Sequence, residues 1–561
     1  MTMELHPCIY YQSEAYSTAG PKLMGRNAAG ESFLNGYLDH GSSDEIWVYS
    51  NSKKEAQHFA DYSQNRGSTA IIKGVTKDNI GSLKNSGLLY YPGPDIERIA
   101  RERMLNDATG WSICGITHTT SSARAMDAIS GLLTAPIYPW DALICTSNAV
   151  KANVKTILES QINYLRHRTG GNEFILPELP VIPLGIHTQE FEFTPEFRST
   201  ARKRLGIKDE AIVVLYLGRL SFHAKAHPLA MYQALEEAST KTGKEVVLIE
   251  CGWHGNDYIK RSFTEAASKV CPNIRVIHLD GREKQVRDNC WASGDIFCSF
   301  SDNIQETFGI VPLEAMAAGM PVVASDWDGY RDTVNHGIEG FLVPTAYPRE
   351  GLGGDLSYRY ANGLDNYDEY CGNNSSLTSV DIGKATEYFS LLISSKALRE
   401  KLGNAGRLKA QEKYDWKTII STYEDLWEDL HRIRIEHRQR QGLMAQSQSA
   451  PMVWPARLDP TIAFNSYPSN KISLNSCVAS NFQDLISLKE RYKMLVQLEV
   501  VSYSKYITPT ENEIAVIFAN ISTTPMPIEK LLIGIDESRK LYSLRAVCWL
   551  LKIGLFRLAM P

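Results

Sequence analysis

Short apolar runs alternate with longer amphipathic stretches along most of this chain, and this alternation restricts the fold more than any other feature of the sequence. The short runs are rich in β-branched and aromatic residues, and the stretches between them are long enough to form helices. Strands separated by helix-length segments indicate β-α-β units with parallel pairing, and continuous apolar runs suit strands that are covered on both faces. The sequence therefore predicts an α/β protein with doubly wound parallel sheets.

The predicted strands fall into two sets, which are separated by the polar segment Glu190–Lys208. The first set is Pro7–Gln12, Glu45–Tyr49, Thr69–Ile72, Gly87–Tyr91, Trp111–Ile116, Asp141–Cys145 and Pro180–Pro183, and the second is Ala211–Leu217, Glu245–Glu250, Ile274–Leu279, Asp295–Phe300, Pro321–Ala324 and Gly340–Val343. Two such sets give two Rossmann-like domains, predicted at 1–190 and 191–415, that face each other across a cleft. Ligands of such sheets bind outside the carboxyl ends of the strands and often between domains.

Length and composition limit the classes of function that need to be considered. A chain of 561 residues is too long for one ordinary core, so two domains plus an appendage are expected. The formal net charge of −5 gives no electrostatic footprint for nucleic acid, which leaves a small molecule as the expected partner. The ten cysteines are scattered and form no Cys-x-x-Cys pair, so we expect reduced thiols, no structural metal and a cytoplasmic location. No run approaches the roughly 20 apolar residues of a membrane span.

The segment from Glu306 to Glu314 is the strongest candidate for a ligand site. It follows the predicted strand Asp295–Phe300 and leads into a helix, and it includes Thr307, Phe308, Gly309 and Ile310. Backbone N–H groups at a helix N-terminus favour an anion, whereas carboxylates are good acceptors for sugar hydroxyls. Two glutamates at such a place therefore suggest a ligand that carries both phosphate and hydroxyl groups, as a nucleotide sugar does.

Two further candidates follow predicted strands of the first set. Gly25 and Arg26 lie in a glycine-rich segment that opens a helix, where glycines allow a ligand to approach the backbone. The spacing is not Gly-x-Gly-x-x-Gly, so dinucleotide binding is unsupported, and a plain helix-entry turn remains the alternative. His118 directly follows the strand Trp111–Ile116, where a site role competes with a structural one.

Residues from about 110 to 435, and more loosely the start of the chain, resemble the large family 4 of retaining glycosyltransferases, which have the GT-B fold. The resemblance rests on the run from Glu306 to Ser325, on Gly218-Arg219-Leu220 with Lys225, on Val181 to Phe191, on Asp141 to Ser147, and on Tyr414-Asp415-Trp416. It implies that the first domain lies on the acceptor side and the second binds the donor. It also implies that a terminal helix, about 416–440, packs back on the first domain.

The resemblance also implies roles for individual residues. Glu306 contacts the donor sugar and Glu314 the ribose, while Arg219 and Lys225 hold the diphosphate and stabilise the leaving group. Fixed cations suit this role because the departing nucleoside diphosphate gains charge in the transition state. The chain departs from the family at Ala226, which follows Lys225 where glycine is usual. The further positions that the resemblance assigns to the site are His118 near the donor sugar, the glycine-rich segment with Gly25 and Arg26 near the donor phosphates, and Gly252 and Arg282 near the base and ribose.

No cofactor and no metal are expected beyond the nucleoside-diphosphate sugar, which acts as a co-substrate. Asp326-Trp327-Asp328 has the form of the Asp-x-Asp metal signature of another glycosyltransferase architecture. Here it follows a helix and a strand in a different context, so we interpret it as a loop beside the sugar pocket. Fixed cations and helix dipoles are expected to take the place of the metal.

The remaining segments give expectations about partners. The polar segment Pro344–Ser379 reads as a surface insertion, and residues 450–561 are predicted to form a mostly helical extension. The basic run His431–Arg440 is either a solvated helix end or a surface for anionic lipid. The apolar end Leu541–Pro561 either packs on the extension or a second subunit, or lies in a membrane interface. The sequence thus leaves open a homo-oligomer and a peripheral contact with the inner membrane face.

Together these features predict a retaining hexosyltransferase that moves a sugar from a nucleoside-diphosphate sugar to the hydroxyl of a sugar, glycan or lipid-linked acceptor. The resemblance places such an enzyme in glycan, polysaccharide or glycolipid biosynthesis. Two other functions remain open, namely a nucleotide-sugar epimerase on the same fold and a non-catalytic nucleotide-sugar-binding protein.

Overall fold

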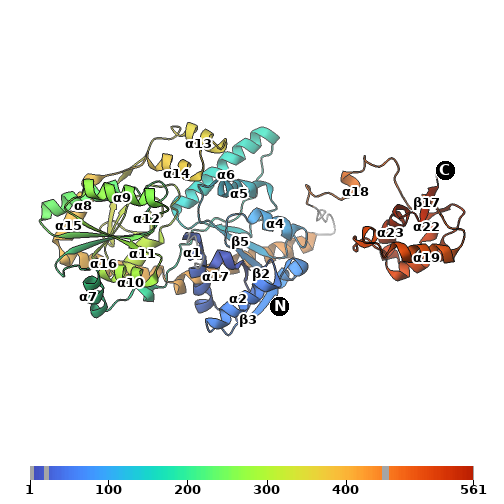
Figure 1. Cartoon of the computed structure of the whole chain (residues 1–561), viewed down its shortest axis with the longest axis horizontal. Helices are drawn as coiled ribbons and strands as arrows, with labels where there is room; N and C mark the ends of the chain where they lie inside the picture. The colour runs from blue at the N-terminus through green and yellow to red at the C-terminus, as the bar shows by residue number, and fades with distance from the viewer. Residues whose placement is uncertain (1–4, 18–24, 445–453, 560–561) are drawn as a thin grey trace. The chain divides into compact units, whose positions relative to one another are not determined.

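The computed structural model describes residues 5–17, 25–444 and 454–559, which form two compact units, Met1–Trp454 and Pro455–Pro561. The first unit contains two six-stranded sheets whose paired strands are all parallel, which confirms the predicted fold class (Figure 1). The first sheet has the order β3-β2-β1-β4-β5-β6, and the second has the order β12-β11-β10-β7-β8-β9. We call each sheet with its helices the first and the second domain.

The strands of the first sheet are β1 (Cys8–Tyr11), β2 (Glu45–Ser50), β3 (Ile71–Val75), β4 (Leu88–Tyr91), β5 (Ser112–Ile116) and β6 (Ala142–Ile144). Its helices are α1 (Gly25–His40), α2 (Lys53–Asn65), α3 (Leu83–Ser86), α4 (Ile96–Met104), α5 (Ala123–Gly131) and α6 (Asn148–Thr169). The strands of the second sheet are β7 (Ile212–Leu217), β8 (Val246–Gly252), β9 (Arg275–Asp280), β10 (Ile296–Ser299), β11 (Val322–Ser325) and β12 (Gly340–Val343). Its helices are α7 (Pro195–Arg204), α8 (Leu229–Thr242), α9 (Asp257–Val270), α10 (Lys284–Ser293), α11 (Ile310–Ala317), α12 (Tyr330–Thr333), α15 (Ile382–Ser394) and α16 (Lys396–Lys413).

Strand β7 illustrates why these runs form strands that are covered on both faces. Its side chains alternate between two hydrophobic clusters, because successive residues of a strand point to opposite faces. Val214 and Tyr216 pack with residues of α8, α9 and α15, whereas Val213 and Leu215 pack with residues of α10 and α11. The sheet is therefore enclosed by helices, and only its strand ends are available for chemistry.

Helix α17 (Trp416–Met444) follows the second domain in the chain but packs on the first. Trp416 is fully buried at its start, and its indole N–H donates to Ser32 Oγ at 2.7 Å. A Cβ atom on Gly36 or on Gly185 would lie 2.5 Å from the indole ring, so both positions require glycine. The helix continues along the first domain past Arg434, which is buried and donates to the carbonyl of Gly110. Part of the basic run thus holds the helix in place.

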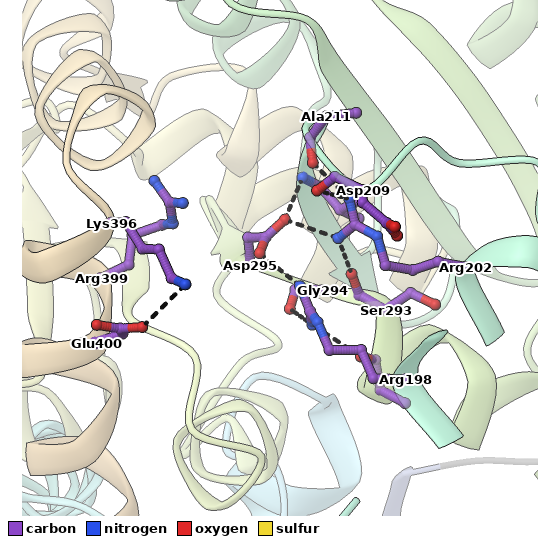
Figure 2. A network of polar contacts seen from close by, with 12 residues as sticks. Arg198, Arg202, Asp209, Ala211, Ser293, Gly294, Asp295, Lys396, Arg399 and Glu400 are labelled. Carbon is purple, nitrogen blue, oxygen red and sulfur yellow. Dashed lines mark hydrogen bonds and ion pairs between the residues drawn. The ribbon is translucent and has the colours of Figure 1, made fainter. Parts of the chain in front are cut away.

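Each sheet is anchored at the amino end of one strand by an aspartate that pairs with a buried arginine. Before β6, Asp141 is fully buried and accepts from both terminal nitrogens of Arg103 and from the Ile113 N–H. Before β10, Asp295 accepts in the same manner from Arg198, Arg202 and the backbone N–H at the start of β7 (Figure 2). These ion pairs lie at the amino ends of the strands, whereas the ligand site is predicted at the carboxyl ends.

One predicted strand is wrong. Pro180–Pro183 forms only one isolated bridge, between Val181 and Cys145, and a second bridge joins Glu178, just before the segment, to Ala142 of β6. Proline lacks the N–H that a ladder needs, so the two prolines prevent the segment from becoming a seventh strand. The other predicted strands are present, with bounds that differ by up to two residues from the prediction except at β3, which runs to Val75.

The segment that the sequence presented as a surface insertion is more ordered than expected. It contains β13 (Thr345–Ala346), α13 (Gly354–Ala361), α14 (Tyr367–Ser375) and β14 (Ser379–Val380). The strands β13 and β14 pair at the base of the insertion, and Cys371 of α14 is fully buried. Its helices also contact the first domain (Figure 1).

The second unit combines helices with a three-stranded antiparallel sheet, which the prediction of a mostly helical extension had omitted. Its elements are α18 (Pro460–Ala463), β15 (Cys477–Ser480), α19 (Leu485–Leu495), α20 (Glu499–Ser502), α21 (Glu511–Asn520), β16 (Met526–Pro527), α22 (Ile528–Leu531), α23 (Lys540–Lys552) and β17 (Phe556–Ala559). Val547 and Leu550 of α23 lie in the core of this unit, so one face of the apolar end packs on the extension itself. No helix within the described residues is long and apolar enough to cross a membrane.

The anchor at Asp295 gives a prediction about stability. Replacement Asp295→Ala leaves Arg202, which is 3% exposed, buried without its carboxylate, and we expect the free energy of unfolding to fall by about 3–5 kcal/mol. The matched control is Lys208→Ala, because the Lys208–Glu245 pair is exposed and we expect its loss to cost less than about 1 kcal/mol. Chemical denaturation measures the free energy of unfolding of both variants. Equal losses would contradict the stabilising role of Asp295.

Candidate functional site

Two charged residues meet at the carboxyl ends of the central strands of the second sheet. Lys225 lies in the segment after β7, and Glu306 lies in the loop after β10; strands β7 and β10 are neighbours in the sheet. The Lys225 ammonium donates to a carboxylate oxygen of Glu306. The Lys225 side chain is 26% exposed and that of Glu306 is 10% exposed, so solvent screens this pair only in part. The topology therefore joins residues that are 81 positions apart in the chain.

Arg219 lies beside this pair and is held by two acceptors. One of its terminal nitrogens donates to the Ala224 carbonyl at 3.0 Å and to Gln305 Oε1 at 2.6 Å. A guanidinium has five N–H donors, so this nitrogen is fixed while other donors of the group remain for a ligand. Two cations thus lie at the same end of the sheet as the N-terminus of α11, an arrangement that favours a multiply charged anion.

The loop between β10 and α11 also contacts the first domain. Thr307 Oγ1 donates to the carbonyl of His118 at 2.7 Å, and Ser147 Oγ donates to the Thr307 carbonyl at 2.8 Å. His118 follows β5, and Ser147 is the N-cap residue of α6, so both come from the carboxyl ends of first-domain strands. The side chain of His118 is partly buried. Strand ends of both sheets therefore surround Thr307.

Glycine is required at two positions of this region. Gly309, the N-cap residue of α11, has a φ of 75°, and a Cβ atom on it would lie 2.0 Å from the Tyr330 ring. Gly252 ends β8, and a Cβ atom there would lie 1.8 Å from the carbonyl oxygen of Gly218. Phe308 is buried, and the helix continues from Ile310, so the turn that carries Thr307 is tightly fixed.

Three carboxyl groups near the site are less acidic than usual. Burial raises the pKa of Glu314, in α11, to about 7 and that of Asp302, in the loop after β10, to about 7. Burial, followed by the charge of Glu306, raises the pKa of Asp328 to about 8. Asp328 has a left-handed backbone with a φ of 45° and lies 3.4 Å from Ser147 Oγ. Neutral carboxyl groups can donate as well as accept hydrogen bonds, which suits a ligand rich in hydroxyls.

Some candidate residues lie apart from this cluster or cannot be placed. Arg282 lies in the turn after β9, and its guanidinium bonds to Asp280 and is 60% exposed. Helix α1 begins at Gly25, but the side chain of Arg26 lies outside the described residues. Asp326 pairs with Arg331, and the described residues contain no group of three or more His, Cys, Asp or Glu side chains that could hold a metal ion.

Sequence reasoning missed three residues of the site. Gln305 precedes Glu306 but carries no signal of its own, and it fixes Arg219. Ser147 had a detectable signal as an N-cap serine after a strand, but not as a contact of Thr307. Tyr367 lies in the insertion, and its hydroxyl reaches Gln305 at 3.1 Å. Only a folded chain brings these residues to the strand ends.

Comparisons with known proteins match the segment that carries Arg219, Lys225 and Glu306. Residues 197–352 match the family described as "Glycosyl transferases group 1". The chain is 32% identical over 184 residues to a D-inositol 3-phosphate glycosyltransferase of Nocardioides sp., and 29% identical over 161 residues to one of Thermobispora bispora. These matches cover 30% and 28% of this chain and only 38% and 37% of those relatives. Among solved structures, an Anabaena protein, Alr3699/HepE in complex with UDP, is 14% identical with a TM-score of 0.49, over 76% of this chain and 100% of that protein.

The raised carboxyl pKa values give a prediction about pH. In the unfolded chain these groups ionise near pH 4, so between about pH 4 and pH 8 the folded chain binds more protons than the unfolded chain. This contribution to stability is complete below about pH 4 and is lost as the pH rises through 7 to 8. We expect Asp328→Asn to reduce the loss of unfolding free energy between pH 5 and pH 9 by roughly 1–3 kcal/mol.

Asparagine suits this test because it tolerates the left-handed backbone that Asp328 adopts. The control is Asp326→Asn, whose carboxyl is 43% exposed. Urea unfolding at several pH values measures both variants, and a wild-type pH dependence in Asp328→Asn would refute the role of this group.

Proposed function

We propose that this chain, whose residues 197–352 match the glycosyl transferases group 1 family, transfers a hexosyl group from a nucleoside-diphosphate sugar to an acceptor hydroxyl, with retention of the anomeric configuration. The observation that carries this proposal is the meeting of Arg219, Lys225 and Glu306 at the carboxyl ends of β7 and β10, beside the N-terminus of α11. Such an arrangement offers cations to a diphosphate and a carboxylate to a sugar.

The two cations have a role in the departure of the nucleoside diphosphate. As the bond between the sugar and the phosphate breaks, negative charge grows on the leaving oxygen, and fixed cations nearby lower the energy of that state. Arg219 is already held by Gln305 and Ala224, so little reorganisation is needed when the charge develops. Lys225 is held by Glu306 until the diphosphate offers it a second anionic partner. In this proposal the cations act without a metal ion or another cofactor.

The glutamates suit the two sugars of the donor. Glu306, paired with Lys225, accepts hydrogen bonds from hydroxyls of the transferred sugar and fixes its orientation. Glu314 has a pKa raised by burial to about 7, so its carboxyl can donate to one ribose hydroxyl and accept from another. Gly252, at the end of β8, and the turn with Arg282 are proposed to lie near the base and ribose.

The acceptor is proposed to attack from the face that the diphosphate leaves. A covalent route would need an ionised carboxylate beside the anomeric carbon. Asp328 lies close to Glu306, but burial and the charge of Glu306 raise its pKa to about 8, so this carboxyl is mostly protonated and a poor nucleophile near neutral pH. A same-face route, in which the departing phosphate helps to remove the acceptor proton, needs no such group. This route preserves the anomeric configuration.

The role of Glu306 can be tested directly. We expect Glu306→Ala to lower kcat for sugar transfer by about 100- to 1,000-fold, because the sugar loses the acceptor that orients it in the transition state. Nucleoside-diphosphate binding should remain within about threefold of the wild type, since Lys225 loses its internal partner and stays available to phosphate. Initial rates and titration calorimetry measure the two effects.

The control for this test is Glu265→Ala, which removes an exposed glutamate that pairs with Lys269 on α9. Thermal-shift screening of the full chain with UDP-, GDP- and ADP-sugars first identifies the donor. Undiminished turnover by Glu306→Ala would reject the site. Conversion of the donor without an acceptor would instead indicate an epimerase, and binding without turnover would indicate a nucleotide-sugar-binding protein.

A further inference from the structure

Helix α14 of the insertion holds the hydroxyl of one tyrosine, Tyr367, in a fixed position. Tyr367 is the first residue of α14, directly after the N-cap residue Asn366. Asn366 and Glu369 form a capping box, in which each side chain bonds to the backbone N–H of the other residue. Tyr370, one turn later, stacks on Tyr360 of α13 with ring centroids 4.3 Å apart. The helix start is thus fixed both by its cap and by packing between α13 and α14.

The hydroxyl of Tyr367 joins the insertion to both domains. It lies 2.8 Å from Ser121 Oγ and 3.4 Å from Thr119 Oγ1, in the first-domain segment between β5 and α5. On its other side it accepts from Gln305 Nε2 at 3.1 Å. Gln305 precedes Glu306 in the loop after β10, so a single oxygen atom contacts the first domain and the candidate site together.

Arg219 fixes the direction of the hydrogen bonds on both sides of Gln305. Arg219 can only donate, so the atom of Gln305 that it contacts must be the amide oxygen. The amide nitrogen of Gln305 then points at Tyr367 and donates to its oxygen. The proton of Tyr367 is left for Ser121 or Thr119, and burial raises the pKa of Tyr367, which keeps that proton in place. A continuous set of hydrogen bonds therefore joins Arg219, Gln305 and Tyr367 to Ser121 and Thr119 of the first domain.

We propose that Tyr367 is a positioning residue for Arg219, which it orients through Gln305 when the insertion is docked on residues 119–123 of the first domain. This inference rests on the proposed function, in which Arg219 stabilises the leaving diphosphate. The amide of Gln305 has two opposite orientations, and only one of them presents an acceptor to Arg219. In that orientation the amide nitrogen needs an acceptor, and the Tyr367 oxygen provides one while its own proton is available to Ser121 or Thr119 of the first domain. Contact between the domains is thereby coupled to the position of the arginine.

A matched control is provided by Tyr360 in the same insertion. Its hydroxyl accepts from the Ala123 N–H at 2.9 Å, so it also bonds to the first domain. No described contact links that hydroxyl to Gln305 or Arg219. Replacement Tyr360→Phe therefore removes a comparable interdomain hydrogen bond without touching the chain of bonds that ends at Arg219.

The test compares the kinetics of the full-length variants with the donor that the screen identifies. We expect Tyr367→Phe to lower kcat about tenfold, the equivalent of about 1.4 kcal/mol, with the KM for the donor within about threefold of the wild type. Tyr360→Phe should keep kcat within about twofold. In a Gln305→Ala background, Tyr367→Phe should have no further effect on kcat, because the link to Arg219 is already broken.

A purely structural role for Tyr367 would give effects on kcat that add in the double variant, since the lost interdomain hydrogen bond would act independently of Gln305. Additive effects, or an equal loss in Tyr360→Phe, would overturn the proposal. A wild-type kcat in Tyr367→Phe would overturn it as well, while leaving the proposed function intact. A wild-type chain that transfers no sugar from any nucleotide sugar would overturn both.

Discussion

The packing of Trp416 between Gly36 and Gly185 is the contact on which the first unit depends. The chain completes the second domain before it reaches this tryptophan, and the helix that follows lies on the first domain. Any side chain on either glycine would meet the indole ring, so the ring has one place in the fold. The end of the second domain is thereby held against the first, which keeps the loops at the two sets of strand ends within hydrogen-bonding distance of each other.

The ion pairs that anchor the sheets and the residues of the candidate site lie at opposite ends of the strands. The amino ends hold the pairs of Arg103 with Asp141 and of Arg202 with Asp295, in which each carboxylate also accepts from the backbone of a neighbouring strand. The carboxyl ends hold loops whose polar groups bond to one another. Because each anchor fixes the register of a strand, it also fixes where that strand ends and its loop begins.

The protein itself holds the two cations of the candidate site in place, without a ligand. Lys225 has Glu306 as its partner, and Arg219 has Gln305. Neither side chain therefore has to move from a solvated position into the site. Paired polar groups that solvent reaches only in part hold a defined geometry, because breaking one bond leaves a partner unsatisfied. The insertion extends this pairing through Tyr367 to Ser121, and a segment outside both sheets is thus part of the same network.

The sequence by itself determined the fold class, nearly all the strands and the position of the Glu306–Glu314 segment between a strand and a helix, because these follow from local periodicity and from residue types adjacent in the chain. It could not exclude a strand at Pro180–Pro183, and it did not foresee the sheet of the second unit, since its short strands pair only with distant partners. Tertiary structure alone decided that Lys225 pairs with Glu306, that Gln305 holds Arg219 and that the hydroxyl of Tyr367 contacts Gln305. Those contacts join residues 62 to 86 positions apart, and the order of strands in the sheet, which no local pattern encodes, brings them together.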